Sequence, residues 1–151
     1  MSDDRARRLT RIAELRQREL DQEAAHLARA RAAERAAQDK LAEAEALAAA
    51  ALAARANLAS GATSAADWTA QESWLATQRA NAQRASESRM HASQAVDKAR
   101  ESVVKMRVRV RGLETLVERV QASEREAQAQ ADRRFEDEVA TQTRAAGPGA
   151  R

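Results

Sequence analysis

Apolar residues recur in a seven-residue pattern through the second half of the chain. Alternating steps of three and four residues from Leu75 meet mostly apolar side chains as far as Val120, and the pattern ends at Glu124. The seam positions are Leu75, Gln78, Ala82, Ala85, Arg89, Ala92, Val96, Ala99, Val103, Met106, Val110, Leu113, Val117 and Val120. A spacing that averages about 3.5 residues is typical of the seam of a left-handed coiled coil. The seam therefore needs a second helix, from this chain or from a partner.

One run of small and turn-forming residues, at positions 57–67, interrupts the helical pattern. Gly61 is free to adopt a positive φ there. Ser64 and Asp67 have the spacing of an N-terminal capping box, and Asp67 is itself an alternative cap for a helix that starts at Trp68. Near the other end of the chain, Gly147 is followed by the single proline of the sequence, and these residues predict the end of the second helix.

These signals predict an all-α fold of two long helices, with the second helix longer. We expect a single domain over residues 1–151, with helix one at about 4–59, a loop at about 60–66, helix two at about 67–145 and a disordered tail at 146–151. A short loop between two long helices favours an antiparallel coiled-coil hairpin.

In an antiparallel hairpin the numbers of two facing residues have a constant sum, and the position of the turn sets that sum at about 126. Most of the helix-one positions that this register places opposite the seam are apolar. The leucines among them are Leu9, Leu20, Leu27 and Leu41. At one polar layer, Arg89 falls opposite Ala37 and within reach of Glu34, which predicts a polar pair that fixes the register.

The same register leaves the end of helix two without a partner. Helix one starts near Asp4, opposite Ala122, so residues 123–145 would project alone over about 30 Å at 1.5 Å per residue. This segment holds Phe135, the only phenylalanine of the chain, among many charged residues. A thin apolar stripe within dense charge suits insertion into a polar partner, and a solvated helix end is the alternative.

Composition narrows the function classes. Charged residues make up 32% of the chain and aromatic residues 2%, which is typical of long helices rather than of a thick globular core. Cysteine is absent, and no apolar run approaches the length of about 20 residues that a membrane span needs. Without a signal-peptide pattern at the start, we expect a cytoplasmic protein.

The sequence contains no recognisable catalytic or cofactor-binding motif. Its four glycines form no phosphate-binding loop, and His26 and His91 would lie too far apart to share a metal. We therefore predict a protein that is not an enzyme, with no catalytic, cofactor-binding or metal residues. Arginines cluster near the start, where a docking patch and an ordinary charged helix surface are both possible.

Two segments carry a resemblance to a known family. They are Arg7-Arg8-Leu9-Thr-Arg-Ile-Ala-Glu-Leu-Arg-Gln-Arg-Glu-Leu20 and the stretch from Leu113 through Asp132-Arg-Arg-Phe-Glu-Asp-Glu-Val139. Together with the two-helix plan, they resemble the FliJ/YscO family of bacterial type III export and secretion systems, including its plant-pathogen Hrp branch. Neither segment distinguishes a flagellar system from an injectisome.

The resemblance implies a non-enzymatic stalk or adaptor at the cytoplasmic face of the secretion apparatus. Such a protein inserts into the hexameric export ATPase, links it to the export gate protein, and also contacts export chaperones. For the partner contacts we select six residues near the two chain ends: Arg5, Arg8, Arg11, Arg133, Arg134 and Phe135.

Two other functions stay open. The first is a structural coiled coil that self-associates through the seam as a parallel dimer or filament, although the loop at Gly61 favours the hairpin. The second is a basic helical hairpin that binds nucleic acid. The formal net charge of only +3 and the absence of aromatic residues in the arginine-rich start argue against nucleic-acid binding.

Overall fold

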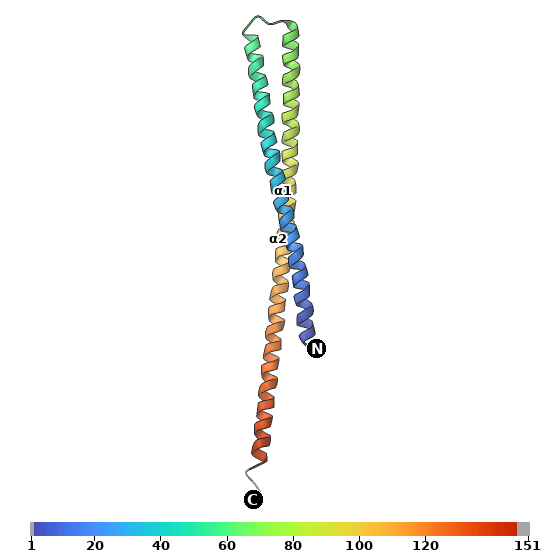
Figure 1. The fold of residues 1–151 in the computed structure, drawn as a ribbon, viewed down its shortest axis with the longest axis vertical. Helices are drawn as coiled ribbons and strands as arrows, with labels where there is room; N and C mark the ends of the chain where they lie inside the picture. Colours follow the sequence, from blue (N-terminus) through green and yellow to red (C-terminus); the bar gives the residue numbers. More distant parts are fainter. Residues whose placement is uncertain (1, 148–151) are drawn as a thin grey trace. The chain divides into compact units, whose positions relative to one another are not determined.

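Two long helices account for nearly all of the chain. The computed structural model describes residues 2–147, with the side chains of residues 4–147. Helix α1 spans Ser2–Ala59 and helix α2 spans Ala65–Ala145, and the described residues contain no strand (Figure 1). The all-α fold with a longer second helix is confirmed. Each helix starts two residues earlier than the sequence predicted, which is the usual uncertainty at a helix end.

The start of α2 shows why the helix begins at Ala65. The Asp67 backbone N–H donates to Ser64 Oγ at 3.1 Å, and the Ser64 hydroxyl donates to Asp67 Oδ2 at 2.6 Å. Ser64 is therefore the N-cap, as the capping-box spacing predicted, with the carboxylate bound to the hydroxyl. The alternative in which Asp67 caps a helix starting at Trp68 is wrong, because Asp67 already lies in the first turn of α2.

The loop between the helices is closed by a hydroxyl group rather than by a left-handed glycine. The Thr63 hydroxyl donates to the Leu58 carbonyl at 2.8 Å, and the Gly61 N–H donates to the same carbonyl at 3.3 Å. The positive φ that the sequence allowed at Gly61 is not used. Among the described glycines only Gly147 has one, with φ of 44°.

Gly147 ends α2 as the sequence predicted. Its N–H donates to the Arg144 carbonyl at 3.3 Å, while the Ala146 N–H donates to the Gln142 carbonyl at 2.9 Å. A glycine in the left-handed conformation just after the last helical residue is a common helix terminator. Of the tail predicted to be disordered, residues 146 and 147 form this turn, and residues 148–151 lie outside the described residues.

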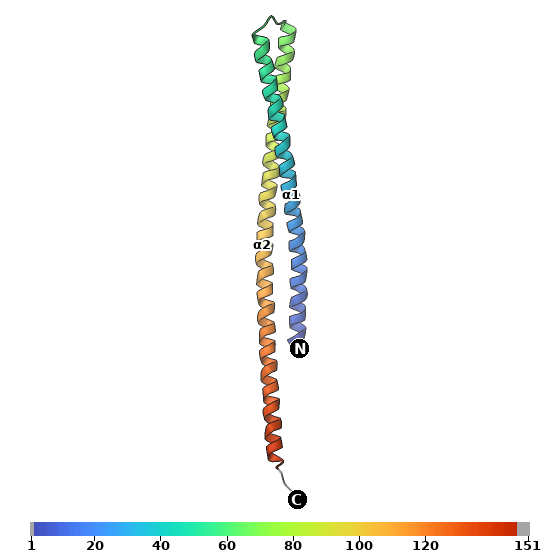
Figure 2. The same ribbon diagram turned by 60° about the vertical axis from the view of Figure 1, so that its left-hand side comes forward.

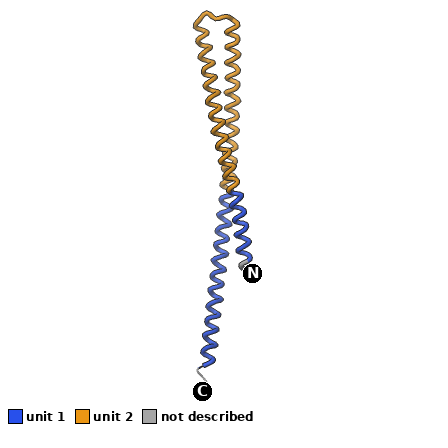
Figure 3. The backbone as a smooth tube through the Cα atoms, in the orientation of Figure 1, with its two compact units in different colours: residues 1–20, 106–151 blue, residues 21–105 orange. Residues whose placement is uncertain are grey.

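The chain divides into two compact units (Figure 3). The hairpin unit consists of residues 21–105, and the terminal unit consists of residues 1–20 and 106–151. In each unit the α1 segment runs antiparallel to the α2 segment and beside it (Figures 1 and 2). The single domain expected over residues 1–151 stays a prediction.

The core of the hairpin unit is the predicted seam. Its buried residues are Leu27, Ala51, Leu75, Val96, Ala99 and Val103. Leu75 is 2% exposed and Ala51 is 0% exposed, and the register places these two residues opposite each other. Gln71 Nε2 donates to the Ala51 carbonyl at 3.1 Å, and Arg55 forms an ion pair with Glu72. These contacts between the helices agree with residue numbers that sum to about 126.

The polar layer predicted at Arg89 is wrong. Arg89 is exposed, and among the described residues it forms no ion pair with Glu34. The opposing residue, Ala37, is small, so the long arginine side chain reaches solvent without displacing its neighbours. Register in this unit therefore depends on the apolar layers and not on a polar pair.

In the terminal unit the seam continues and then ends. Ala6 and Val110 are buried, and the other seam residues of both helices are half-buried apart from the exposed Arg16. Glu124 is the last half-buried seam position, and beyond it every described residue except Ala129 is exposed. The prediction that self-pairing ends near Glu124 is confirmed. We call residues 125–145 the α2 extension.

Candidate interaction surfaces

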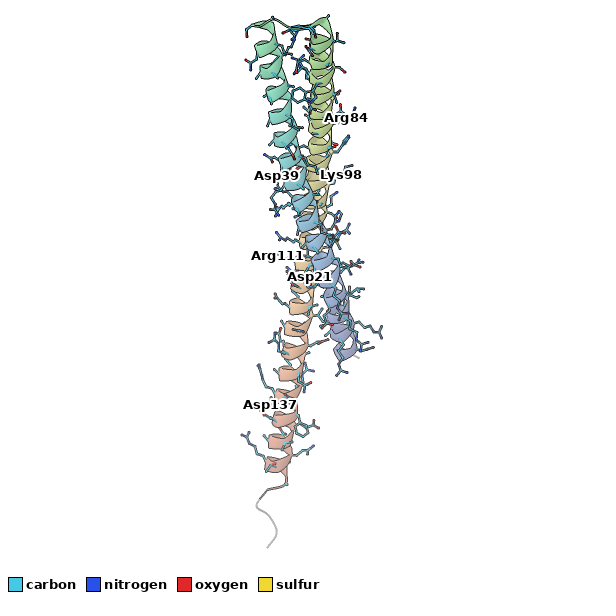
Figure 4. The ribbon with its side chains drawn as sticks, turned by 45° about the horizontal axis from the view of Figure 1, so that its top comes forward. Asp21, Asp39, Arg84, Lys98, Arg111 and Asp137 are labelled. Carbon is cyan, nitrogen blue, oxygen red and sulfur yellow. The ribbon has the colours of Figure 1, made fainter. Side chains whose placement is uncertain are left out.

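The α2 extension presents its apolar side chains directly to solvent. Phe135 is 68% exposed and Val139 is 45% exposed, and they continue a stripe of residues four apart that starts at Ala127. Figure 4 shows the same stretch of α2, with Asp137 labelled, without a helix beside it. A large exposed aromatic side chain on an otherwise charged helix marks a candidate contact for another protein.

The two arginines before Phe135 point in different directions. Arg133, Arg134 and Phe135 are all exposed. Successive residues of an α-helix are turned by about 100°, so these three side chains spread around most of the helix. The extension therefore offers a cation on more than one side, as a partner that surrounds the helix would require.

The arginines predicted near the start follow one another along α1. Arg5 and Arg8 share a stripe of α1 with Ile12 and Leu15, because these residues are three or four positions apart. Arg8 also forms an ion pair with Asp4. Arg11 is three positions from Arg8 and four from Leu15, so it adjoins this stripe, and it also lines a groove of about 410 Å³ together with Gln121 and Glu124. All three arginines are exposed.

Ile12 and Leu15 were missed by sequence reasoning. They are 45% and 54% exposed, so they form an apolar continuation of the stripe that begins with Arg5 and Arg8. The spacing of residues 5, 8, 12 and 15 already indicated that these side chains share one side of the helix. The coiled-coil pattern selects a different side, the one that contains the seam position Ala13. The stripe combines two cations with two aliphatic side chains, which suits a partner surface of mixed character.

A second groove of the terminal unit was also missed. Its volume is about 430 Å³, and it lies between the two helices. Its lining residues are Thr10, Ala13, Glu14, Gln17, Glu114, Val117 and Glu118. Its apolar lining comes from Ala13 and Val117, and glutamates of both helices line it as well. The seam pattern cannot show it, because the groove depends on which flanking residues the two helices bring together.

In the described part of the chain, no group of three or more His, Cys, Asp or Glu side chains is arranged to hold a metal ion. His26 is exposed and lines a hollow of about 280 Å³ together with Glu23 and Lys98. Neither described helix is long and apolar enough to cross a membrane.

Comparison with known proteins gives the family. The model of the flagellar FliJ protein family matches residues 5–147, which covers both helices. No curated protein and no solved structure is significantly similar to the chain. The family consists of stalk-like components of flagellar and type III export and is not a family of enzymes. Because the match extends over almost the whole chain, this two-helix protein belongs to the flagellar FliJ protein family.

Proposed function

We propose that this protein is the stalk of a type III export apparatus, which inserts into the hexameric export ATPase and links it to the export gate protein. The observation that carries the proposal is the α2 extension, a charged helical segment of residues 125–145 that has no second helix beside it and exposes Phe135 at its middle. The protein would act at the cytoplasmic face of the apparatus and contact export chaperones as well.

The shape of an α-helix supports insertion into a ring. One helix with its side chains is about 10–12 Å across, so the extension needs only a narrow central opening. Its charged residues of both signs can meet polar walls, and Phe135 can enter an apolar recess between subunits. The arginines at positions 133 and 134 add cations on different sides of the helix.

Such a stalk affects ATP turnover without doing chemistry. If it contacts one conformational state of an ATPase subunit better than another, it shifts the population toward that state. The size of the effect equals the difference between its binding free energies for the two states. Phe135 and its flanking arginines would supply that difference, while Arg5, Arg8 and Arg11 are proposed as further contacts near the start of α1.

The direct test uses the purified full-length chain and the export ATPase hexamer from the same system. We expect the chain to co-sediment with the hexamer and to raise its rate of ATP hydrolysis. Phe135→Ala should weaken both effects by about tenfold or more, since a buried aromatic anchor contributes at least 2 kcal/mol.

Met90→Ala is the matched control. Met90 is 51% exposed in the hairpin unit, so its loss removes an exposed apolar side chain from a surface that the proposal does not use. The control should bind and stimulate like the natural protein. If the natural chain neither binds the hexamer nor changes its turnover, the proposed function is wrong.

A further inference from the structure

Helix α2 contains a glycine that nothing within the chain requires. Gly112 is the only one of the four glycines of the sequence that lies within α1 or α2. Its φ is not positive, and a Cβ added there would meet no atom within 4 Å. Glycine is a poorer helix former than alanine, and its usual benefit is to let another molecule or segment approach the backbone closely. Since the described chain supplies no such neighbour, a close approach that explains Gly112 has to come from another molecule.

Gly112 lies between two exposed aliphatic side chains of the terminal unit. Val108 is 68% exposed, as much as Phe135, and Leu116 is 40% exposed. They are four positions before and four positions after Gly112. Residues four apart are neighbours along one ridge of an α-helix, so the missing side chain of Gly112 leaves a notch between the other two. We call Val108, Gly112 and Leu116 the notched ridge.

Arginines stand at both ends of the notched ridge. Arg109 and Arg119 are exposed, and they lie with the three ridge residues within an arc of about 100° on α2. Among the described residues neither arginine takes part in an ion pair. The two arginines are separated by about 15 Å along the helix at 1.5 Å per residue. The ridge is therefore apolar at its centre and cationic at its ends.

The second groove of the terminal unit, with its glutamates, lies on the opposite side of the seam. Thr10 and Glu114 line that groove, and Ile12 and Leu116 are two positions further along their helices. Two positions turn a side chain to a point about 160° away around the helix. Ile12 is 45% exposed, and the antiparallel register sets it within about one helical turn of Leu116. An occupant of the ridge can therefore contact an aliphatic side chain of α1 as well, away from the glutamates of the groove.

We propose that the notched ridge is the docking site for a helix of another protein. The partner helix places an apolar side chain in the notch at Gly112 and acidic side chains beside Arg109 and Arg119. Charge complementarity selects this occupant, because a second copy that presented the same ridge would set its own arginines against these. The interface uses none of the residues assigned above to the export ATPase, so this proposal and the proposed function can fail separately.

Synthetic helical peptides test the chemistry of the occupant. Each peptide has an apolar stripe with alanine, leucine or phenylalanine at its centre, and either glutamates or lysines near both ends, about 15 Å apart. We expect the full-length chain to bind at least one glutamate peptide about tenfold more tightly than its lysine counterpart in fluorescence anisotropy, because opposite charges then meet. Binding should weaken between 0.1 M and 1 M salt, since the screening length falls from about 10 Å to about 3 Å. Equal binding of the glutamate and lysine peptides, or no binding of either, overturns the proposal.

Filling the notch tests the contribution of Gly112. Gly112→Leu should weaken the binding of the glutamate peptide by about tenfold or more, because the new side chain occupies the notch. The same variant should raise the midpoint of urea unfolding, since leucine is the better helix former. A variant that merely disturbed the fold would not change binding and stability in opposite directions. Ala53→Leu is the control, because it adds a leucine at an exposed position of the hairpin unit and should leave binding unchanged. If Gly112→Leu binds the peptide like this control, the notch is not the docking site.

Charge reversal tests the two arginines. Arg109→Glu/Arg119→Glu should prefer the lysine peptide to the glutamate peptide, because the charge at the ends of the ridge has changed sign. Arg107→Glu/Arg111→Glu is the matched control, since it makes the same change of charge at exposed positions on another side of the same part of α2. This control should keep the preference for the glutamate peptide. If the first variant keeps that preference, or if the control loses it, the overall charge and not the ridge selects the peptide.

Sedimentation velocity of the chain alone distinguishes this occupant from a second copy. We expect no self-association that depends on position 112, because the arginines of two ridges repel each other. A dimer of the natural chain that Gly112→Leu abolishes would assign the ridge to a second copy, and the proposed partner helix would then be wrong.

Discussion

The hairpin unit and the α2 extension are made of similar residues but are stabilised in different ways. Residues 21–105 place large side chains against small ones, so that Leu75 lies at 2% exposure opposite the fully buried Ala51. In residues 125–145 the largest apolar side chain, Phe135, is 68% exposed. Helicity in the first region depends on packing, whereas in the second it depends on intrinsic propensity and on continuity with the paired helix.

This difference has a functional consequence. A helix that is covered by its neighbour has few apolar side chains left to contact another protein. A helix that extends past its neighbour keeps all sides accessible, which is why the extension carries the proposed contact with the ATPase. The same composition, rich in alanine, arginine and glutamate, is thus packed against a second helix in one region and left exposed in the other.

The largest expected effect is the difference in stability loss between truncating a buried apolar side chain of the hairpin unit and truncating an exposed one of the α2 extension. Leu75→Ala should lower the free energy of unfolding by about 2–5 kcal/mol, because it removes a buried side chain and leaves a cavity. Phe135→Ala should change it by less than about 0.5 kcal/mol, because Phe135 packs against little. Chemical denaturation followed by circular dichroism measures both, and equal effects of the two substitutions would remove the distinction between the regions.

A smaller effect is expected from overfilling the seam. Ala51→Leu should destabilise the protein by about 1–3 kcal/mol, since Ala51 is fully buried against the other helix. The control is Ala53→Leu, two residues further along α1 at an exposed position, where the change should be close to neutral. Thermal unfolding of the two variants compares them directly. A neutral Ala51→Leu would mean that the close approach of the helices at this layer is absent in solution.

The smallest effect tests propensity at an exposed position of the paired α2. Gly112→Ala should stabilise the protein by about 0.5–1 kcal/mol, because glycine is a poor helix former and a Cβ here meets no atom within 4 Å. Gly61→Ala is the control, since Gly61 also has open space around it but lies in the loop. The midpoint of urea unfolding should rise only for Gly112→Ala. A decrease would indicate that another surface covers this side of α2.

Much of the fold was predictable because a coiled coil is specified by local rules. The spacing of apolar residues gave the seam, the loop residues gave the turn, and the sum of residue numbers gave the register, which the burial of Leu27, Ala51 and Leu75 confirms. The end of pairing near Glu124 was predictable for the same reason. The capping by Ser64 followed from a spacing of three residues.

The wrong predictions concern residues whose conformation the apolar periodicity does not determine. Arg89 occupies a seam position yet extends into solvent beside the small Ala37, because a long cationic side chain is more stable hydrated than buried. Gly61 had the freedom to be left-handed, but the Thr63 hydroxyl closes the loop without it.

The sequence by itself therefore determined the helices, their pairing and the point where pairing stops, because each depends on the periodic placement of apolar residues along one chain. Only the tertiary structure decided which flanking residues meet across the seam. The groove bordered by Glu14, Glu114 and Glu118 exists because two helices of fixed register bring together side chains about 100 positions apart. That distance in sequence is why this groove could be located only after the helices were placed side by side.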